Sequence, residues 1–297
     1  MHNAKHILLV VLLIISPYAT AQFGNFGDML KKGLDATKKV AEANKDITEA
    51  EEIKMGDGIA AMILGASPLH PDQNLQRYVN RVGRWVASQS SRADLPWAFG
   101  VIDTPTVNAF ALPGGKVFVS IGLLKRLNNE AELAGVLAHE IAHVMQKHQV
   151  KAIQAARSSG ALQSVGQTVA AESIARSNAG KNAITSSLSN AAAGEGIEFM
   201  KNGLFLRPLD KALEYEADRI GVVLAARAGY DPYGLVAAIQ ILSNLKPDDA
   251  GVSLLMSTHP TPNDRLTELE RFTDTLDKFS SQPQVENRFV KVMAAVK

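Results

Sequence analysis

The chain has 297 residues, 46% of them hydrophobic, so it can bury a substantial core in one large domain or two smaller ones. Its 31 basic and 30 acidic side chains nearly cancel, which excludes the basic surface expected of a nucleic-acid-binding protein. The absence of cysteine excludes disulfides and leaves only nitrogen and oxygen as metal-ligand atoms.

The N-terminus has the pattern of a secretory signal peptide. One lysine precedes an unbroken apolar run over residues 7–15, too short to span a bilayer, and Ala19 and Ala21 then form a small-x-small cleavage site. We expect cleavage after Ala21 and a mature chain that starts at Gln22 and is exported, to the periplasm in a bacterium. The signal holds one lysine and no acid, so the mature formal charge is 31 − 1 − 30 = 0. An uncleaved membrane anchor is the alternative.

Residues 22–52 are predicted to form an amphipathic helix, because apolar side chains recur there at helical spacing between lysines. This helix either packs on the rest of the protein or lies on a membrane surface. We expect a main domain over 53–279 and a C-terminal tail over 280–297. The mature chain has no segment that predicts a transmembrane helix, so any membrane contact would be peripheral.

The first part of the main domain combines a helix with short strands. Residues 74–88 show the apolar spacing of an amphipathic helix. The period then changes, and 97–103, 108–112 and 116–121 are short β-type runs separated by proline and glycine. We predict a small antiparallel meander beside the next helix, with 116–121 as an exposed edge to which a peptide can add. The fold class is α+β and mainly helical.

Four further helices are predicted from caps and apolar stripes. One begins at Asn129, a second runs from Asp210 to Gly229, a third starts near Tyr233, and the last extends from Thr261-Pro262 to about Phe279. Residues 152–206 are rich in Ala, Ser, Gly and Asn and have weak periodicity, so the sequence predicts no definite structure there.

The helix that begins at Asn129 carries His139 and His143, with Glu140 beside the first. Because each helical residue turns about 100°, the two imidazoles lie about 40° apart and can reach one cation from the same side. Glu140 lies next to that site, where a general base can take a proton from a metal-coordinated water. Zinc suits such ligands with an open position, so we predict one catalytic zinc per chain. A helix that merely carries two histidines is the alternative.

A catalytic zinc site needs a third protein ligand. His148 lies about 180° round the predicted helix from His139, so we interpret it as a surface residue or one that supports a ligand. Glu214 is a candidate, with Asp218 one turn further along the same helix face and the small Gly221 allowing close approach. A merely solvated acidic turn is the alternative. Nothing in the stretch without predicted structure positions its carboxylates: Glu172, Glu195 and Glu198.

Four stretches together resemble a known family: "NAFALPGGKVFVSIGLL", "HEIAHVMQKH", "EYEADRIGVVLAARAGYDP" and "STHPTPNDRL". They are similar to the gluzincin zinc metallopeptidases related to HtpX and the CAAX prenyl proteases, and most of all to the soluble periplasmic BepA- and LoiP-like branch. The resemblance covers about residues 50 to 275 and implies a zincin-type domain.

The resemblance also implies roles for single residues. It makes Glu214 the third zinc ligand beside the two motif histidines, Glu140 the general base, and Asp218 and Arg265 residues that support the ligands. His259 belongs to a His-Pro pattern shared with the family. We hypothesise that it faces the zinc, either as an oxyanion stabiliser or as a reversible fourth ligand that gates the site.

These observations predict a zinc-dependent endopeptidase that acts on polypeptides. The resemblance suggests misfolded or unassembled envelope proteins as its substrates, outer-membrane proteins among them. A chaperone-like assembly factor with low or gated proteolysis is the main alternative. A purely structural zinc domain is a third reading, which would require four permanent protein ligands.

Overall fold

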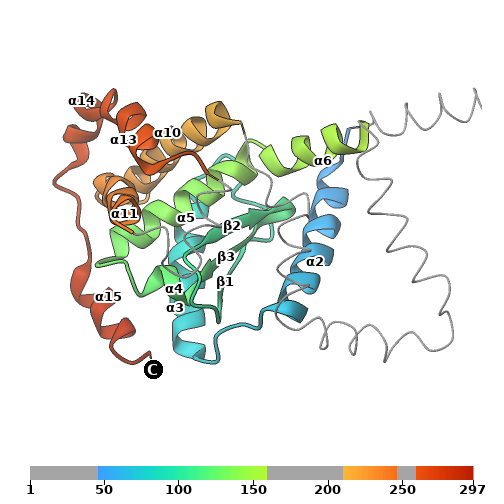
Figure 1. Ribbon diagram of the computed structural model, residues 1–297, viewed down its shortest axis with the longest axis horizontal. Helices are drawn as coiled ribbons and strands as arrows, with labels where there is room; N and C mark the ends of the chain where they lie inside the picture. The colour runs from blue at the N-terminus through green and yellow to red at the C-terminus, as the bar shows by residue number, and fades with distance from the viewer. Residues whose placement is uncertain (1–45, 159–209, 246–258, 297) are drawn as a thin grey trace, which may run out of the picture. The chain divides into compact units, whose positions relative to one another are not determined.

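The computed structural model describes residues 46–158, 210–245 and 259–296 (Figure 1). The signal peptide and most of the helix predicted over 22–52 lie outside these ranges. The first described helix is α2, Glu49–Ala66, which begins after Thr48 with a complete capping box to Glu51. The predicted domain boundary at 52–53 therefore falls inside a helix.

Three strands form at the predicted places but in a different topology. β1 (Ala98–Ile102), β2 (Ala109–Leu112) and β3 (Lys116–Ser120) have the spatial order β1-β3-β2. β3 pairs antiparallel with β2 and parallel with β1, so the predicted antiparallel meander is wrong. Residues 103–108 carry the chain past the position that β3 later occupies, and β3 then inserts between the first two strands.

The turn from β2 to β3 is a short 3-10 element, Pro113–Gly115, in which both glycines have positive φ. This turn returns the chain tightly along β2 and places β3 in the centre of the sheet. The prediction that 116–121 offers an exposed edge is therefore wrong as well. The edges of this sheet are β1 and β2, and β2 is the one that packs on helix α5 (Glu130–Met145).

Every residue of helix α5 except Met145 is buried. The helix lies centrally among the described elements (Figure 1). It begins after Asn129, whose side chain accepts from the backbone N–H of Glu132, as predicted. α3 (Gln73–Ala87) follows its Asp72 cap and packs between β1 and α5. The short α4 (Ile121–Leu124) continues directly from β3.

The helices that follow residue 209 pack on the side of α5 away from the sheet. α10 (Lys211–Arg227) has Asp210 as its cap, and Gly229 just past its end has φ 85°, both as predicted. α11 (Tyr233–Ser243) also packs on α5, and α13 (Pro262–Glu270) packs on α10 and α11. Together with α5, these helices surround the candidate site.

The last predicted helix, 261–279, is interrupted. α13 ends at Glu270, and α14 (Thr273–Leu276) and a 3-10 turn (Asp277–Phe279) follow. The Thr273 hydroxyl donates to the carbonyl of Glu270, a local bond that competes with helical backbone pairing. Phe279 is consequently 42% exposed rather than part of a buried stripe.

The C-terminal segment packs on the domain through α15 (Glu286–Met293). Phe289 is buried, its ring 6.5 Å from that of Tyr78 on α3. Helix α6 (His148–Ser158) follows α5 after a break at Lys147, whose φ is 55°. Among the described residues, no helix has the length and apolarity needed to cross a membrane.

Candidate metal centre

The site lies where α5 and α10 approach most closely. A Cβ added to Gly221 on α10 would lie 3.1 Å from the backbone nitrogen of His139, a tighter contact than most Cβ atoms make, so glycine allows the helices to lie this close without strain. The small-residue face predicted for this helix therefore does bring the two helices together. The close approach places Glu214, near the start of α10, against both histidines of α5.

The two histidines and Glu214 converge on one point. The Nε2 atoms of His139 and His143 are 3.1 Å apart, and Glu214 offers Oε2 at 3.6 Å from the first and Oε1 at 3.5 Å from the second. All three side chains are at most 4% exposed. Oε1 of Glu214 is buried and has no hydrogen-bond partner among the described residues. Two imidazole nitrogens and an unpaired carboxylate oxygen facing one another fit a divalent cation such as zinc.

His259 joins this cluster from the segment before α13. Its Nδ1 lies 2.5 Å from Oε2 of Glu214, and its ring centre is 5.6 Å from that of His139. One ligand atom from each of the four side chains, His139, His143, Glu214 and His259, lies within 4.8 Å of the other three. The structure thus places His259 beside the predicted metal ligands.

The pKa values of the clustered side chains depend on one another, with the Glu214 carboxylate at the centre. Burial raises its pKa, but the charge of His259, the hydrogen bond from it and the two motif histidines outweigh that effect and hold the pKa far below its usual range. Burial disfavours the charged form of His259, and the Glu214 carboxylate more than compensates, so the pKa of His259 is raised. Burial, followed by the charge of His139, lowers the pKa of His143 well below its usual value. Neutral imidazole is the form that binds a metal.

Asp218 and Arg265 support His139 from behind. Asp218 Oδ1 lies 2.8 Å from His139 Nδ1, and the Arg265 guanidinium holds the same carboxylate through Nε at 2.9 Å and a second nitrogen at 2.5 Å. Burial raises the Asp218 pKa, but the charge of Arg265 and its hydrogen bond lower it more strongly. An ionised Asp218 accepts the Nδ1 hydrogen and leaves Nε2 free for a metal.

Glu140 lies beside the cluster in an almost fully buried position. Burial raises the pKa of its carboxyl, which brings it toward the range in which a side chain can both accept and donate a proton. A cavity of about 30 Å³ adjoins it, bounded by His139, His259 and Arg265. The rest of the cavity wall is apolar: Ala109, Leu123, Val136, Leu235, Ala238, Ile239 and Leu242.

Of the two interpretations of His148, a surface residue or one that supports a ligand, the structure contradicts the first. His148 is fully buried, and its Nδ1 lies 2.9 Å from Nδ1 of His143. The helical-wheel argument does not apply, because the chain turns at Lys147 and α6 starts in a new direction. Neither this break nor the contact of His148 with Glu216 on α10 has a signal in the sequence. The three glutamates of the stretch without predicted structure lie outside the described residues: Glu172, Glu195 and Glu198.

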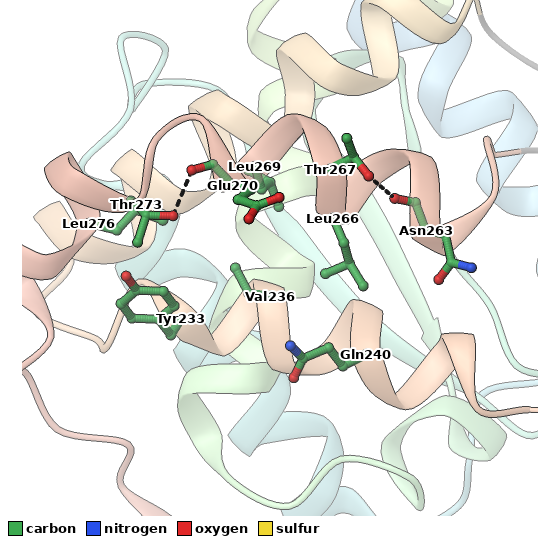
Figure 2. Close-up of a pocket in the computed structure, with 10 residues that line it drawn as sticks. All are labelled: Tyr233, Val236, Gln240, Asn263, Leu266, Thr267, Leu269, Glu270, Thr273 and Leu276. Atoms are coloured by element: carbon green, nitrogen blue, oxygen red, sulfur yellow. Dashed lines mark hydrogen bonds between the residues drawn. The ribbon is translucent and has the colours of Figure 1, made fainter.

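A second and larger cavity, of about 410 Å³, lies between α11 and α13. Figure 2 shows Val236 and Gln240 on one side of it and Leu266 on the other, with Tyr233 at one end. It contains none of the four clustered side chains. The size of a cavity therefore does not identify the candidate site. The smaller cavity, beside Glu140, is the one lined by residues of the cluster.

The chain is similar to several metallopeptidases. It is 31% identical over 227 residues to the beta-barrel assembly-enhancing protease of Escherichia coli (strain K12), covering 76% of this chain and 44% of that protein. It is 32% identical over 195 residues to the mitochondrial metalloendopeptidase OMA1 of Schizosaccharomyces pombe, covering 66% of this chain and 52% of that protein. The chain spans about half the length of these relatives.

The family assignment rests on a match to a family model that covers more than half of the chain. Residues 73–273 match the model of peptidase family M48. That range runs from the start of α3 to the start of α14 and includes every side chain of the centre described above. Family M48 metallopeptidases use zinc, in agreement with the nitrogen and oxygen ligands that converge here. The chain belongs to peptidase family M48.

Proposed function

We propose that the protein is a zinc-dependent endopeptidase that hydrolyses peptide bonds of envelope polypeptides. The observation that carries the proposal is the convergence of His139, His143 and the unpaired Glu214 oxygen, with Glu140 directly beside them. These three ligands would hold the ion. When bound, zinc supplies a Lewis acid that polarises a peptide carbonyl and lowers the pKa of water to about 7.

The chain's own groups would handle the protons. Glu140 accepts a proton from the attacking water and delivers it to the leaving amine, a cycle that suits a carboxylate whose pKa is raised by burial. Asp218 keeps the hydrogen of His139 on Nδ1. Arg265 in turn holds Asp218 ionised and in place.

The surroundings of Glu140 suit a peptide with a small apolar side chain. The cavity beside it is largely apolar and includes Ala109, the first residue of edge strand β2. An extended substrate that added to β2 would run beside α5 and could place a side chain in this cavity. Mapping of cleavage sites in an unfolded protein should show small apolar residues enriched at one position. Cleavage without any such preference would contradict the role of the cavity.

The substrate class is inferred from the N-terminal sequence and from the relatives. The signal-peptide pattern supports export, and the name of the Escherichia coli relative links a protease to β-barrel assembly. We therefore place the protein in the periplasm, with misfolded or unassembled outer-membrane proteins as substrates. The same name supports a second candidate function, a factor that assists assembly by binding its clients with little proteolysis.

The test compares the chain from Gln22 with a Glu140→Gln variant. We expect one zinc per chain in both proteins, measured by elemental analysis, and cleavage of dye-labelled casein only by the wild type. The variant should lose at least about 100-fold in rate, because a general base contributes about 10²- to 10⁴-fold. Absence of zinc from the wild type would overturn the proposal. Zinc in both with equal, undetectable cleavage would favour the assembly factor.

His259 calls for a separate variant, because two roles are open to it. If it is a gating ligand, His259→Ala should raise the cleavage rate and lower zinc affinity. If it stabilises the oxyanion, the same change should lower kcat by about 10²- to 10³-fold with zinc affinity little altered. A variant whose cleavage rate and zinc affinity both match the wild type would exclude both roles.

A further inference from the structure

A chain of three side chains, His143, His148 and Glu216, extends from the candidate metal centre toward solvent. His143 Nδ1 lies 2.9 Å from His148 Nδ1, and His148 Nε2 lies 3.4 Å from Oε2 of Glu216. His148 is fully buried, and its Nε2 makes no hydrogen bond among the described residues although the Glu216 carboxylate lies within ion-pair distance. The Glu216 side chain is 39% exposed. Nothing in the proposed chemistry uses these last two residues.

Metal binding by His143 through Nε2 would determine which nitrogen of each ring carries a hydrogen. His143 directs Nε2 at His139 and Glu214, so a metal would use the Nε2 lone pair and leave the hydrogen on Nδ1. The ring nitrogen opposite it, His148 Nδ1, must then be the acceptor. His148 is consequently the tautomer with its hydrogen on Nε2, the atom that faces the Glu216 carboxylate.

The backbone is bent to make this arrangement. Lys147 has φ 55°, a left-handed conformation that costs a non-glycine residue about 1 kcal/mol or more. If α5 continued without the break, His148 would point about 180° away from His139. Instead, the turn folds it back under His143, with the two ring centres 5.0 Å apart. The strained turn therefore places a hydrogen-bond acceptor behind a metal ligand.

We propose that His148 is a positioning residue: it accepts the Nδ1 hydrogen of His143 and so holds Nε2 toward the metal, while Glu216 selects the tautomer of His148. The inference rests on the proposed function, since it assumes that His143 binds zinc. His148 would then accept the Nδ1 hydrogen of His143 as Asp218 accepts that of His139. The difference is that the acceptor is an imidazole, with the Glu216 carboxylate on its other side.

Two substitutions separate the hydrogen bond from simple packing. His148→Phe keeps a ring but removes the acceptor, and His148→Asn removes the ring but keeps an oxygen near the position of Nδ1. Zinc affinity, measured by competition with a chromophoric chelator, should fall about 10- to 100-fold in the Phe variant and stay within about threefold in the Asn variant. Lys151→Ala on the exposed face of α6 is the matched control and should change nothing.

The opposite order, with Phe tolerated and Asn damaging, would show that His148 only fills space and would overturn the inference. A second measurement does not depend on any variant folding. In the zinc-loaded wild type with ¹⁵N-labelled histidine, the NMR shifts of His148 should show a hydrogen on Nε2 and none on Nδ1. Finding it on Nδ1 would also overturn the inference. A wild type that binds no zinc would instead overturn the proposed function, and this inference with it.

Discussion

At the residue scale, the centre depends on buried charges that are paired with one another. The carboxylate of Asp218 and the guanidinium of Arg265 are both almost fully buried and make two hydrogen bonds to each other. Such a pair contributes little net stability when intact, but removal of one partner leaves the other charge buried and uncompensated. We therefore expect Asp218, which we propose orients His139, to contribute to folding stability as well.

Asp218→Asn tests both consequences. The amide cannot balance the charge of Arg265, so we expect a loss of about 3–5 kcal/mol in the free energy of unfolding of the metal-free protein. We also expect zinc affinity to fall about 10- to 100-fold, because a neutral amide no longer selects the tautomer of His139. Chemical denaturation and chelator competition measure the two effects.

Asp264→Asn is the control for this experiment. Asp264 also pairs with a basic residue, Lys211, but both side chains are exposed. That pair contributes only about 0–1 kcal/mol, so this variant should stay close to the wild type in stability and in zinc affinity. Equal losses in the two variants would contradict the role assigned to Asp218.

At the scale of elements, the separation of α5 and α10 sets the geometry of the site. The proposed ligands come from both helices, so any increase in that separation moves Glu214 away from His139 and His143. Gly221 is the closest point, where a Cβ would lie 3.1 Å from the nitrogen and 3.2 Å from the Cα of His139. Both are backbone atoms of a buried helix and cannot move aside independently.

Gly221→Ala should therefore weaken zinc binding although residue 221 touches no metal. We expect a loss of about 1–3 kcal/mol in stability from overpacking and a severalfold lower zinc affinity. Gly58→Ala in α2 is the matched control, because a Cβ there meets nothing within 4 Å. At that exposed helical position, alanine should raise stability by about 0.5–1 kcal/mol. A Gly221→Ala protein as stable as wild type, with unchanged zinc affinity, would show that the helices can separate freely.

At the scale of the whole molecule, one buried carboxylate joins segments that are far apart in the chain. Glu130, the first residue of α5, accepts from the hydroxyls of Tyr78 and Tyr230, each at 2.7 Å, and from the guanidinium of Arg288 on α15. Burial raises the pKa of Glu130, but Arg288 and the two hydroxyls lower it more. The C-terminal helix is thus held to the core by a group that must stay ionised.

This arrangement predicts a pH-dependent effect of Arg288→Ala. The pKa of Glu130 is lowered in the folded protein below its ordinary value of 4.5, so its stabilisation is present above about pH 4.5 and lost as the pH falls further. Removal of Arg288 should cost about 1 kcal/mol near pH 7, a modest value because the arginine is 59% exposed. The difference from wild type should shrink below pH 4.

Urea denaturation at several pH values measures this difference, with Lys291→Ala on the same helix as the control. Lys291 is exposed and should have no effect at any pH. A difference between Arg288→Ala and wild type that is as large at pH 3 as at pH 7 would show that Arg288 acts through packing and not through the charge of Glu130.

Much of the local structure could be predicted because its causes lie within a few residues. The caps Asn129, Asp210 and Thr261 mark the starts of α5, α10 and α13, and β1, β2 and β3 lie within the predicted β-type runs. The interruption after Glu270 could not be predicted, because its apolar stripe continues in the sequence while the chain turns.

The sequence by itself was enough to predict the class of chemistry. Two histidines one helical turn apart with a glutamate beside them are a local pattern typical of a zinc site with a general base, and the resemblance to a known family added Glu214 as the third ligand. Only the tertiary structure decided the arrangement around them. It placed β3 in the middle of the sheet, made β2 the edge beside the site, and folded His148 back beneath His143. Strand order and the turn at Lys147 depend on contacts between residues distant in the chain, which no local pattern encodes.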